Sequence, residues 1–105
     1  MVTSIYTVFI VRYDSNDSGI PVSESRKLVN ARSRAYKELS HKKGMNVNGR
    51  YKAKICCTVF GGNYHGLTYW VGEITNNVYD MRYWYPMKGG KYELKSNGTL
   101  GKKLH

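Results

Sequence analysis

The sequence predicts an α+β protein in which a single helix packs on one face of a mainly antiparallel sheet of about four to six strands. Three observations lead to this fold class. A nearly continuous apolar run comes first, a stretch with helical periodicity follows, and the remainder alternates between strand-like segments and turn-forming residues. We therefore expect the order β-α-β-β-β, with short strands at the C-terminal end.

The size and charge of the chain narrow the classes of partner. A chain of 105 residues is long enough for one modest core, so we expect a single domain, 1–105. Its 17 Lys and Arg residues against 7 Asp and Glu give a net charge of +10. Such a field attracts polyanions, which indicates nucleic acid first, then an anionic membrane or an acidic protein surface.

Cysteine and histidine usage indicates a cytoplasmic protein without metal or cofactor. Cys56 and Cys57 are adjacent in a strand-like segment, so they should face opposite sides and remain reduced. The three histidines lack zinc-ligand spacing to these cysteines. The apolar start, Met1 to Tyr13, has no basic leader and is too short to span a bilayer.

The first element is a strand from Ser4 to Tyr13, because β-branched and aromatic residues dominate it. Turn formers fill Asp14 to Pro21, with part of the spacing of a calcium loop. The twelfth position of that spacing is Ser25 instead of a bidentate glutamate, and a strand precedes the loop where a helix should. An ordinary polar loop is the better interpretation.

A helix is predicted from Glu24 to Lys43, with Ser23 as its N-cap. Its apolar stripe should pack on the sheet and consists of Leu28, Ala31, Ala35 and Leu39. Its opposite side is basic and carries Arg26, Lys27, Arg34, Lys37 and His41. This side is either a solvated helix surface or a phosphate-contacting one, the latter through Arg26, Arg34 and Lys37.

The next strand, Arg50 to Phe60, has the cleanest alternation in the chain and follows a turn signal at Asn48-Gly49. One face is apolar and consists of Tyr51, Ala53, Ile55, Cys57 and Val59. The other consists of Arg50, Lys52, Lys54, Cys56 and Thr58. Its three cations recur roughly every 6 to 7 Å, close to the phosphate repeat of a nucleic-acid strand.

A hairpin is predicted about Asn76-Asn77, with strands Leu67 to Ile74 and Val78 to Tyr85. A two-residue turn would place Glu73 opposite Asp80. The more apolar face should be the core side and holds Trp70, Ile74, Tyr79, Met81 and Tyr83. The outer face then holds Tyr69, Glu73, Asp80, Arg82 and Trp84.

The C-terminal part should form short strands. Pro86 is expected to end the hairpin, and Gly89-Gly90 to turn the chain. Lys91 to Leu94 reads as an edge strand, and Asn97-Gly98 as the turn into a last strand from Thr99 to Leu104.

The leading functional hypothesis is a small domain that binds RNA, single-stranded DNA or a nucleoprotein complex. Phosphate-neutralising cations beside flat rings on a sheet face form a surface on which bases stack. The residues expected to form the interface are Arg50, Lys52, Lys54, Tyr69, Arg82 and Trp84, with Arg26, Arg34 and Lys37 on the helix.

Two other classes remain open. Exposed Tyr, Trp and Arg also suit a protein-binding inhibitor or adaptor, such as an accessory protein of a mobile element that blocks a host machine. A small metal-independent ribonuclease would draw on His65, Tyr64, Arg82, Glu73 and His105. A magnesium nuclease built on Glu73 and Asp80 is weaker still, because no third carboxylate lies beside them. No catalytic residue is assigned.

Overall fold

The computed structural model describes residues 2–12, 19–43, 51–75, 78–81, 84–87, 90–95 and 98–103. Within these ranges the side chains of 41–43, 84–87, 90–91 and 103 are not described. Several sequence predictions fall wholly or partly outside the described residues: most of the loop with calcium-like spacing, and the turns at Asn48-Gly49, Asn76-Asn77, Gly89-Gly90 and Asn97-Gly98.

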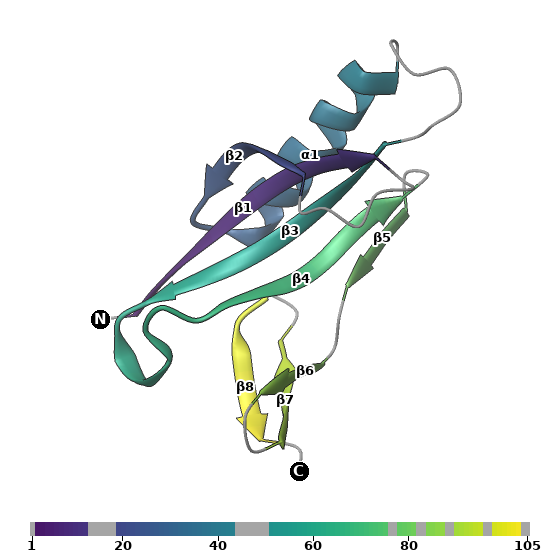
Figure 1. The fold of residues 1–105 in the computed structure, drawn as a ribbon. Coiled ribbons are helices and arrows are strands. Elements are labelled where there is room, and N and C mark those ends of the chain that lie inside the picture. Colours follow the sequence, from purple (N-terminus) through teal and green to yellow (C-terminus); the bar gives the residue numbers. More distant parts are fainter. Residues whose placement is uncertain are drawn as a thin grey trace.

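The chain forms two antiparallel sheets and one long helix. The elements are β1 (Thr3–Arg12), β2 (Ile20–Ser25), α1 (Leu28–Lys43), β3 (Tyr51–Phe60), the 3-10 turn η1 (Gly62–Tyr64), β4 (Thr68–Thr75), β5 (Val78–Met81), β6 (Trp84–Met87), β7 (Gly90–Leu94) and β8 (Leu100–Lys103). The main sheet has the order β2-β1-β3-β4-β5, and a smaller one has the order β6-β7-β8 (Figure 1). The predicted fold class is therefore confirmed.

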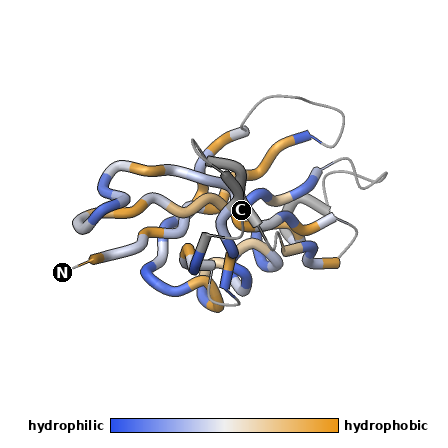
Figure 2. The backbone as a smooth tube through the Cα atoms, turned by 90° about the horizontal axis from the view of Figure 1, so that it is seen from below, coloured by the Kyte–Doolittle hydropathy of each residue, from blue (hydrophilic) through white to orange (hydrophobic). Residues whose placement is uncertain are grey.

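Helix α1 packs on one face of the main sheet, where it crosses β1 and β3 (Figure 1). Its contact residues Leu28, Ala31 and Ala35 are buried, and the two alanines let the helix backbone come close to the strands. In β3 every second residue from Ala53 to Val59 is buried in the core. Hydrophobic and hydrophilic segments alternate along the tube in Figure 2. The apolar stripe of the helix and the apolar face of β3 were both predicted correctly.

The small sheet covers the rest of the same face. Leu94 of β7 is buried in the core cluster, and Leu100 of β8 packs against it. The turn between them is tight, because the Gly98 amide donates to the carbonyl of Lys95 at 2.8 Å. Tyr69 of β4 donates from its hydroxyl to the Gly98 carbonyl at 2.9 Å. The core is thus covered by α1 on one part of the sheet and by β7 and β8 on another.

The predicted start of the helix was wrong by four residues. Ser23 and Glu24 belong to β2, where they stand opposite Val8 and Thr7 of β1. The helix begins at Leu28, the first residue of the apolar stripe. Pairing along β1 outweighs the capping preference of a serine followed by glutamate, because the ladder satisfies the backbone groups of this segment. Strand β2 is irregular, since Pro21 stands opposite Phe9 and leaves Val22 as an extra residue.

The predicted faces of β4 were right at Glu73 and Ile74 but wrong at Tyr69 and Trp70, because a bulge lies between these two pairs. Ile55 stands opposite Gly72, whereas the next residue, Cys56, stands opposite Trp70, so Val71 is extra. One added residue reverses the alternation beyond it. Tyr69 therefore points into the core with 2% of its surface exposed, and Trp70 points to the other side.

The predicted second hairpin strand was too long. Val78 to Met81 form β5, and Glu73 stands opposite Asp80 as expected. Trp84 lies in β6 opposite Glu93 of β7, not opposite Tyr69 of β4. Pro86 lies inside β6 instead of ending a strand. The two short strands near the C-terminal end agree with β7 and β8.

Candidate nucleic-acid interface

The face of the main sheet opposite α1 is the predicted interface, and we call it the open face. In the described part of the chain, no helix or second sheet packs on it (Figure 1). The side chains used below to define it are Phe9, Lys52, Lys54, Trp70, Glu73 and Asp80. Lys52 and Lys54 are partly exposed on this face, as the alternation of β3 predicted.

An aromatic and cationic cluster lies at the centre of the open face. The rings of Phe9 and Trp70 meet edge to face, with centroids 5.5 Å apart and an interplanar angle of 74°. The ammonium nitrogen of Lys54 lies 4.2 Å from the centroid of the Trp70 ring. Edge-to-face rings and a cation over indole are both favourable arrangements, so Phe9 and Lys54 hold the indole in a fixed orientation.

Acidic residues balance the lysines of the open face. The Lys52 ammonium lies 3.9 Å from a Glu73 carboxylate oxygen, and Asp80 stands beside Glu73 on the adjacent strand. The two lysines and the two carboxylates together carry no net charge. The open face near Trp70 therefore presents an aromatic ring for stacking but no strong positive potential.

Several predicted interface residues do not meet on this face. Tyr69 is excluded, because it is buried in the core. Arg50 and Arg82 lie outside the described residues, and Trp84 is described only as backbone in β6. Tyr69 and Trp84, which were predicted to share the outer face of one hairpin, lie in different sheets.

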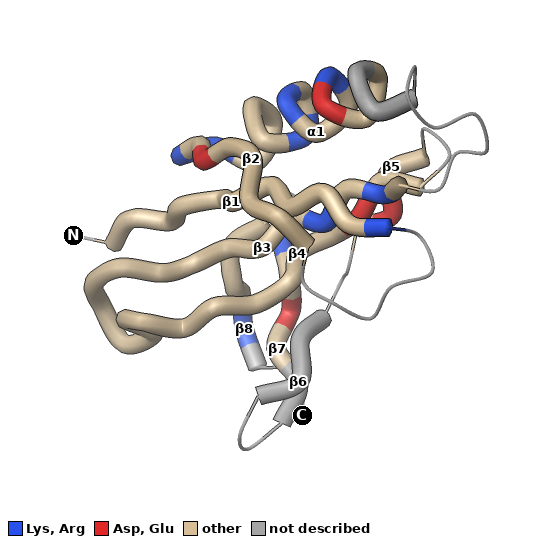
Figure 3. The backbone as a smooth tube through the Cα atoms, turned by 45° about the horizontal axis from the view of Figure 1, so that its top comes forward, with Lys and Arg blue, Asp and Glu red and all other residues tan. Residues whose placement is uncertain are grey.

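The predicted helix residues lie on the other side of the molecule. Arg26, Arg34 and Lys37 are exposed. Arg34 pairs with Glu38 one turn later, at 3.1 Å. Figure 3 shows the basic positions following α1 and its approach from β2, away from the lysines and acids of β3 to β5. The described lysines of the open face and the described basic residues along α1 therefore lie on opposite sides of the main sheet.

The two cysteines face opposite sides of the sheet, as predicted, and both are free. Burial raises the pKa of the Cys56 thiol on the open face, which keeps it protonated at neutral pH. Cys57 lies in the core near Tyr6 and Tyr69. Burial raises the pKa of both tyrosine hydroxyls as well.

The residues considered for ribonuclease chemistry do not converge among the described ones. The ring nitrogen Nδ1 of His65 accepts a hydrogen bond from the Gly61 amide at 2.7 Å, in the loop before β4. Glu73 lies near the far end of β4, and the five residue-to-residue steps from Thr68 to Glu73 span roughly 17 Å of strand. Within the described ranges, no three potential ligands come together as a metal site.

Sequence reasoning missed two aromatic contacts. Phe9 was assigned to a strand covered on both faces, although its position opposite Lys54 puts it on the open face. Arg32 of α1 lies with its guanidinium carbon 4.0 Å from the centroid of the Tyr79 ring of β5. The position of Arg32 beside the apolar stripe was a signal of this contact, since a long cation there must reach past the sheet edge.

The fold and the open face define a class: an α+β protein whose sheet carries aromatic and cationic side chains on the surface opposite its helix. The chain matches no family model, no curated protein and no solved structure. Helix α1, the long helix of the described part, is neither long nor apolar enough to cross a membrane. The function has to be argued from the geometry.

Proposed function

We propose that this protein binds single-stranded nucleic acid, RNA or DNA, on its open face. The observation that carries the proposal is the Trp70 ring, held by Phe9 and accompanied by Lys54 on a surface that no described helix or sheet covers. Any of the bases can stack on an indole ring, and this contact contributes about 1–3 kcal/mol per base to the free energy of binding. Lysine beside the ring supplies a partner for the neighbouring phosphate.

The mixed charge of the open face shapes how binding depends on salt. Because Lys52 is engaged with Glu73, Lys54 is the cation best placed to meet a phosphate beside Trp70. Each phosphate neutralised on a single strand adds about 0.7 to the slope of affinity against salt concentration on logarithmic axes. A stacking-dominated site should therefore give a shallow slope, in spite of the net charge of +10.

The test is fluorescence anisotropy with labelled oligonucleotides of roughly 12 residues, which fills a typical single-strand site. Trp70→Ala should weaken binding about 5- to 150-fold, the equivalent of the stacking contribution, with little change in the salt slope. Lys54→Gln should weaken binding and lower the slope by about 0.7. Tyr64→Ala is the matched aromatic control, because Tyr64 is partly exposed in η1, away from the open face.

Equal affinity of Trp70→Ala and the unchanged protein would contradict the proposal, as would the lack of binding at low salt.

The alternative of a protein-binding inhibitor or adaptor stays a prediction. A pull-down from nuclease-treated lysate that retains a stoichiometric protein partner through the open face would favour it. The cytoplasmic location also stays a prediction, and the two free thiols agree with a reducing compartment.

A further inference from the structure

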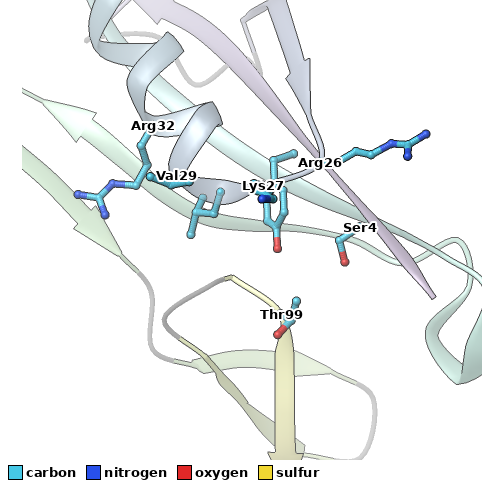
Figure 4. A pocket seen from close by; sticks show the side chains of 8 residues that line it. Ser4, Arg26, Lys27, Val29, Arg32 and Thr99 are labelled. Atoms are coloured by element: carbon cyan, nitrogen blue, oxygen red, sulfur yellow. The ribbon is translucent and has the colours of Figure 1, made fainter. Parts of the chain in front are cut away.

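A second candidate site lies on the helix side of the main sheet, between α1 and the small sheet, which together cover the core. It is a cavity of about 490 Å³ between β1, the start of α1 and the segment that enters β8 (Figure 4). Three basic residues line it: Arg26, Lys27 and Arg32. Among its described lining residues there is no carboxylate.

We infer that this cavity binds the phosphate group of a small organic phosphate of about nucleotide size. Three cations with no carboxylate among the other lining residues create a positive potential, and a concave site with walls of low dielectric constant focuses it. Guanidinium and ammonium groups form their strongest hydrogen bonds with phosphate and carboxylate oxygens. A dianionic phosphate matches the excess charge better than a single carboxylate does.

Arg32 provides the second observation, independent of the charge count. Its guanidinium is held against the Tyr79 ring, and its Nε atom is buried without a hydrogen-bond partner among the described residues. A buried donor without a partner costs free energy, so the guanidinium would gain by turning toward an anion that enters the cavity. Figure 4 shows the Arg32 guanidinium on one side of the cavity, directed away from Ser4 and Thr99, while Arg26 extends outward on the other side. Lys27 lies between them.

The remaining walls suit the organic part of the ligand. Ser4 and Thr99 bring hydroxyl groups from opposite sides, one from β1 and the other from the segment entering β8 (Figure 4). Leu28 and Val29 add apolar surface. Sites for small organic ligands fall between about 300 and 1,000 Å³, and combine apolar walls with a few placed polar groups. The volume here exceeds what inorganic phosphate alone would fill.

This site is separate from the open face. Ser4 stands opposite Val59 and Tyr6 opposite Cys57, on the core side of the sheet, whereas Phe9 and Lys54 pair on the other side. A variant of Trp70 therefore leaves the cavity residues in place. The two proposals can fail independently of each other.

Isothermal titration calorimetry with the whole protein tests the inference. The probes are adenosine monophosphate, adenosine, inorganic pyrophosphate, and a trinucleotide with or without a 5′-phosphate. Lys27→Asn is the principal variant, since Lys27 immediately precedes the helix and its carbonyl accepts the first helical bond from Ala31. Asparagine is a favoured residue at this capping position, so the variant removes the charge while preserving the helix. Lys37→Asn, exposed further along α1, is the matched control.

We expect saturable binding of the monophosphate. Its affinity should be about tenfold weaker in Lys27→Asn and within twofold of the original in Lys37→Asn. Arg32→Gln should weaken it at least as much, and its thermal unfolding curve reports whether the fold survives. Trp70→Ala should leave it unchanged. Stronger binding of pyrophosphate than of the monophosphate identifies the source as an inorganic anion, and a preference for the 5′-phosphorylated trinucleotide identifies a strand end. Equal binding of adenosine and its monophosphate, or equal losses in Lys27→Asn and Lys37→Asn, would overturn the inference.

Discussion

At the scale of single residues, the exchange of Tyr69 and Trp70 decides what each face of the sheet offers. Tyr69 was expected to stack on bases, yet its ring is buried and its hydroxyl binds the Gly98 carbonyl. Trp70, which was expected in the core, is the partly exposed ring of the open face. Tyr69 therefore stabilises the fold, and Trp70 carries the proposed function.

Tyr69→Phe should lower the free energy of unfolding by about 1–2 kcal/mol, because it leaves the Gly98 carbonyl without its donor in the core. Urea denaturation would show a lower midpoint with an unchanged slope. Tyr64→Phe, in the partly exposed η1 turn, should change stability by less than about 0.5 kcal/mol. Nucleic-acid affinity should stay the same in Tyr69→Phe, and a large loss of affinity without unfolding would contradict the assignment of Tyr69 to the core.

The buried tyrosines also predict where stability is lost with pH. Burial raises the pKa of Tyr6 and Tyr69 above the ordinary tyrosine value near 10. The unfolded chain then loses these protons first, so stability is fully present below about pH 10 and falls as the pH rises toward the folded-state pKa. Each tyrosine contributes a loss of about 1.4 kcal/mol per pH unit in that window.

Unfolding curves measured from pH 8 to 11.5 would check this dependence, together with the tyrosinate absorbance. Tyr69→Phe should show a shallower fall above pH 10 than the original protein. An identical pH profile for the two proteins would contradict the burial of the Tyr69 hydroxyl.

At the scale of elements, the docking of the β7–β8 turn on the main sheet depends on one glycine. Gly98 has a φ of +84°, and a Cβ there would lie 2.9 Å from Tyr6 and 3.2 Å from Leu28. Gly66 has the same φ, but a Cβ there would meet no atom within 4 Å. The two positions share the backbone requirement and differ in packing alone.

Gly66→Ala should cost about 1–2 kcal/mol, the strain of a left-handed residue with a side chain. Gly98→Ala should cost about 1–3 kcal/mol more, because the added methyl group also overpacks the site beside Tyr6. Chemical denaturation of both variants measures the difference. Equal losses would show that the turn moves away from Tyr6 freely, contrary to the close packing described above.

The same scale shows which elements were predictable. The strand β3 was predictable because its apolar residues recur with a period of two, and the core stripe of α1 because its apolar residues recur with a period of 3.6. The start of α1 was not, because Ser23 and Glu24 suit a helix cap locally and only their pairing with β1 makes them strand. A bulge leaves no mark in local alternation either, since Val71 is as suitable for a regular strand as for an irregular one.

At the scale of the whole molecule, the net charge alone did not locate a site. The sequence predicted cations beside rings on the sheet face and further cations on the outer side of the helix, and in the structure the described members of these two sets lie on opposite sides of the main sheet. The open face keeps the ring and is balanced in charge near it. The cavity side keeps unbalanced charge and lacks an exposed tryptophan among its lining residues. Stacking and charge are therefore assigned to different proposals.

The irregular strand β2 has a consequence for how copies of the protein behave toward each other. A sheet that ends in unpaired backbone groups is a template on which another chain adds a strand, and β2 and β5 are the two ends of the main sheet. Proline lacks an amide hydrogen, and the extra residue after Pro21 twists the strand away from flat pairing. Strand β5 is only four residues long and carries Asp80.

Pro21→Val should accordingly make the protein prone to concentration-dependent self-association, because it restores a donor and a β-branched side chain at the outermost strand. Light scattering over a range of protein concentrations would detect the change, with Ser33→Val on the exposed face of α1 as the control for added apolar surface. Equal behaviour of the two variants would mean that Pro21 has no such role. The irregular β2 and the short, charged β5 thus disfavour edge-to-edge pairing of two copies, in addition to the mutual repulsion that a net charge of +10 produces.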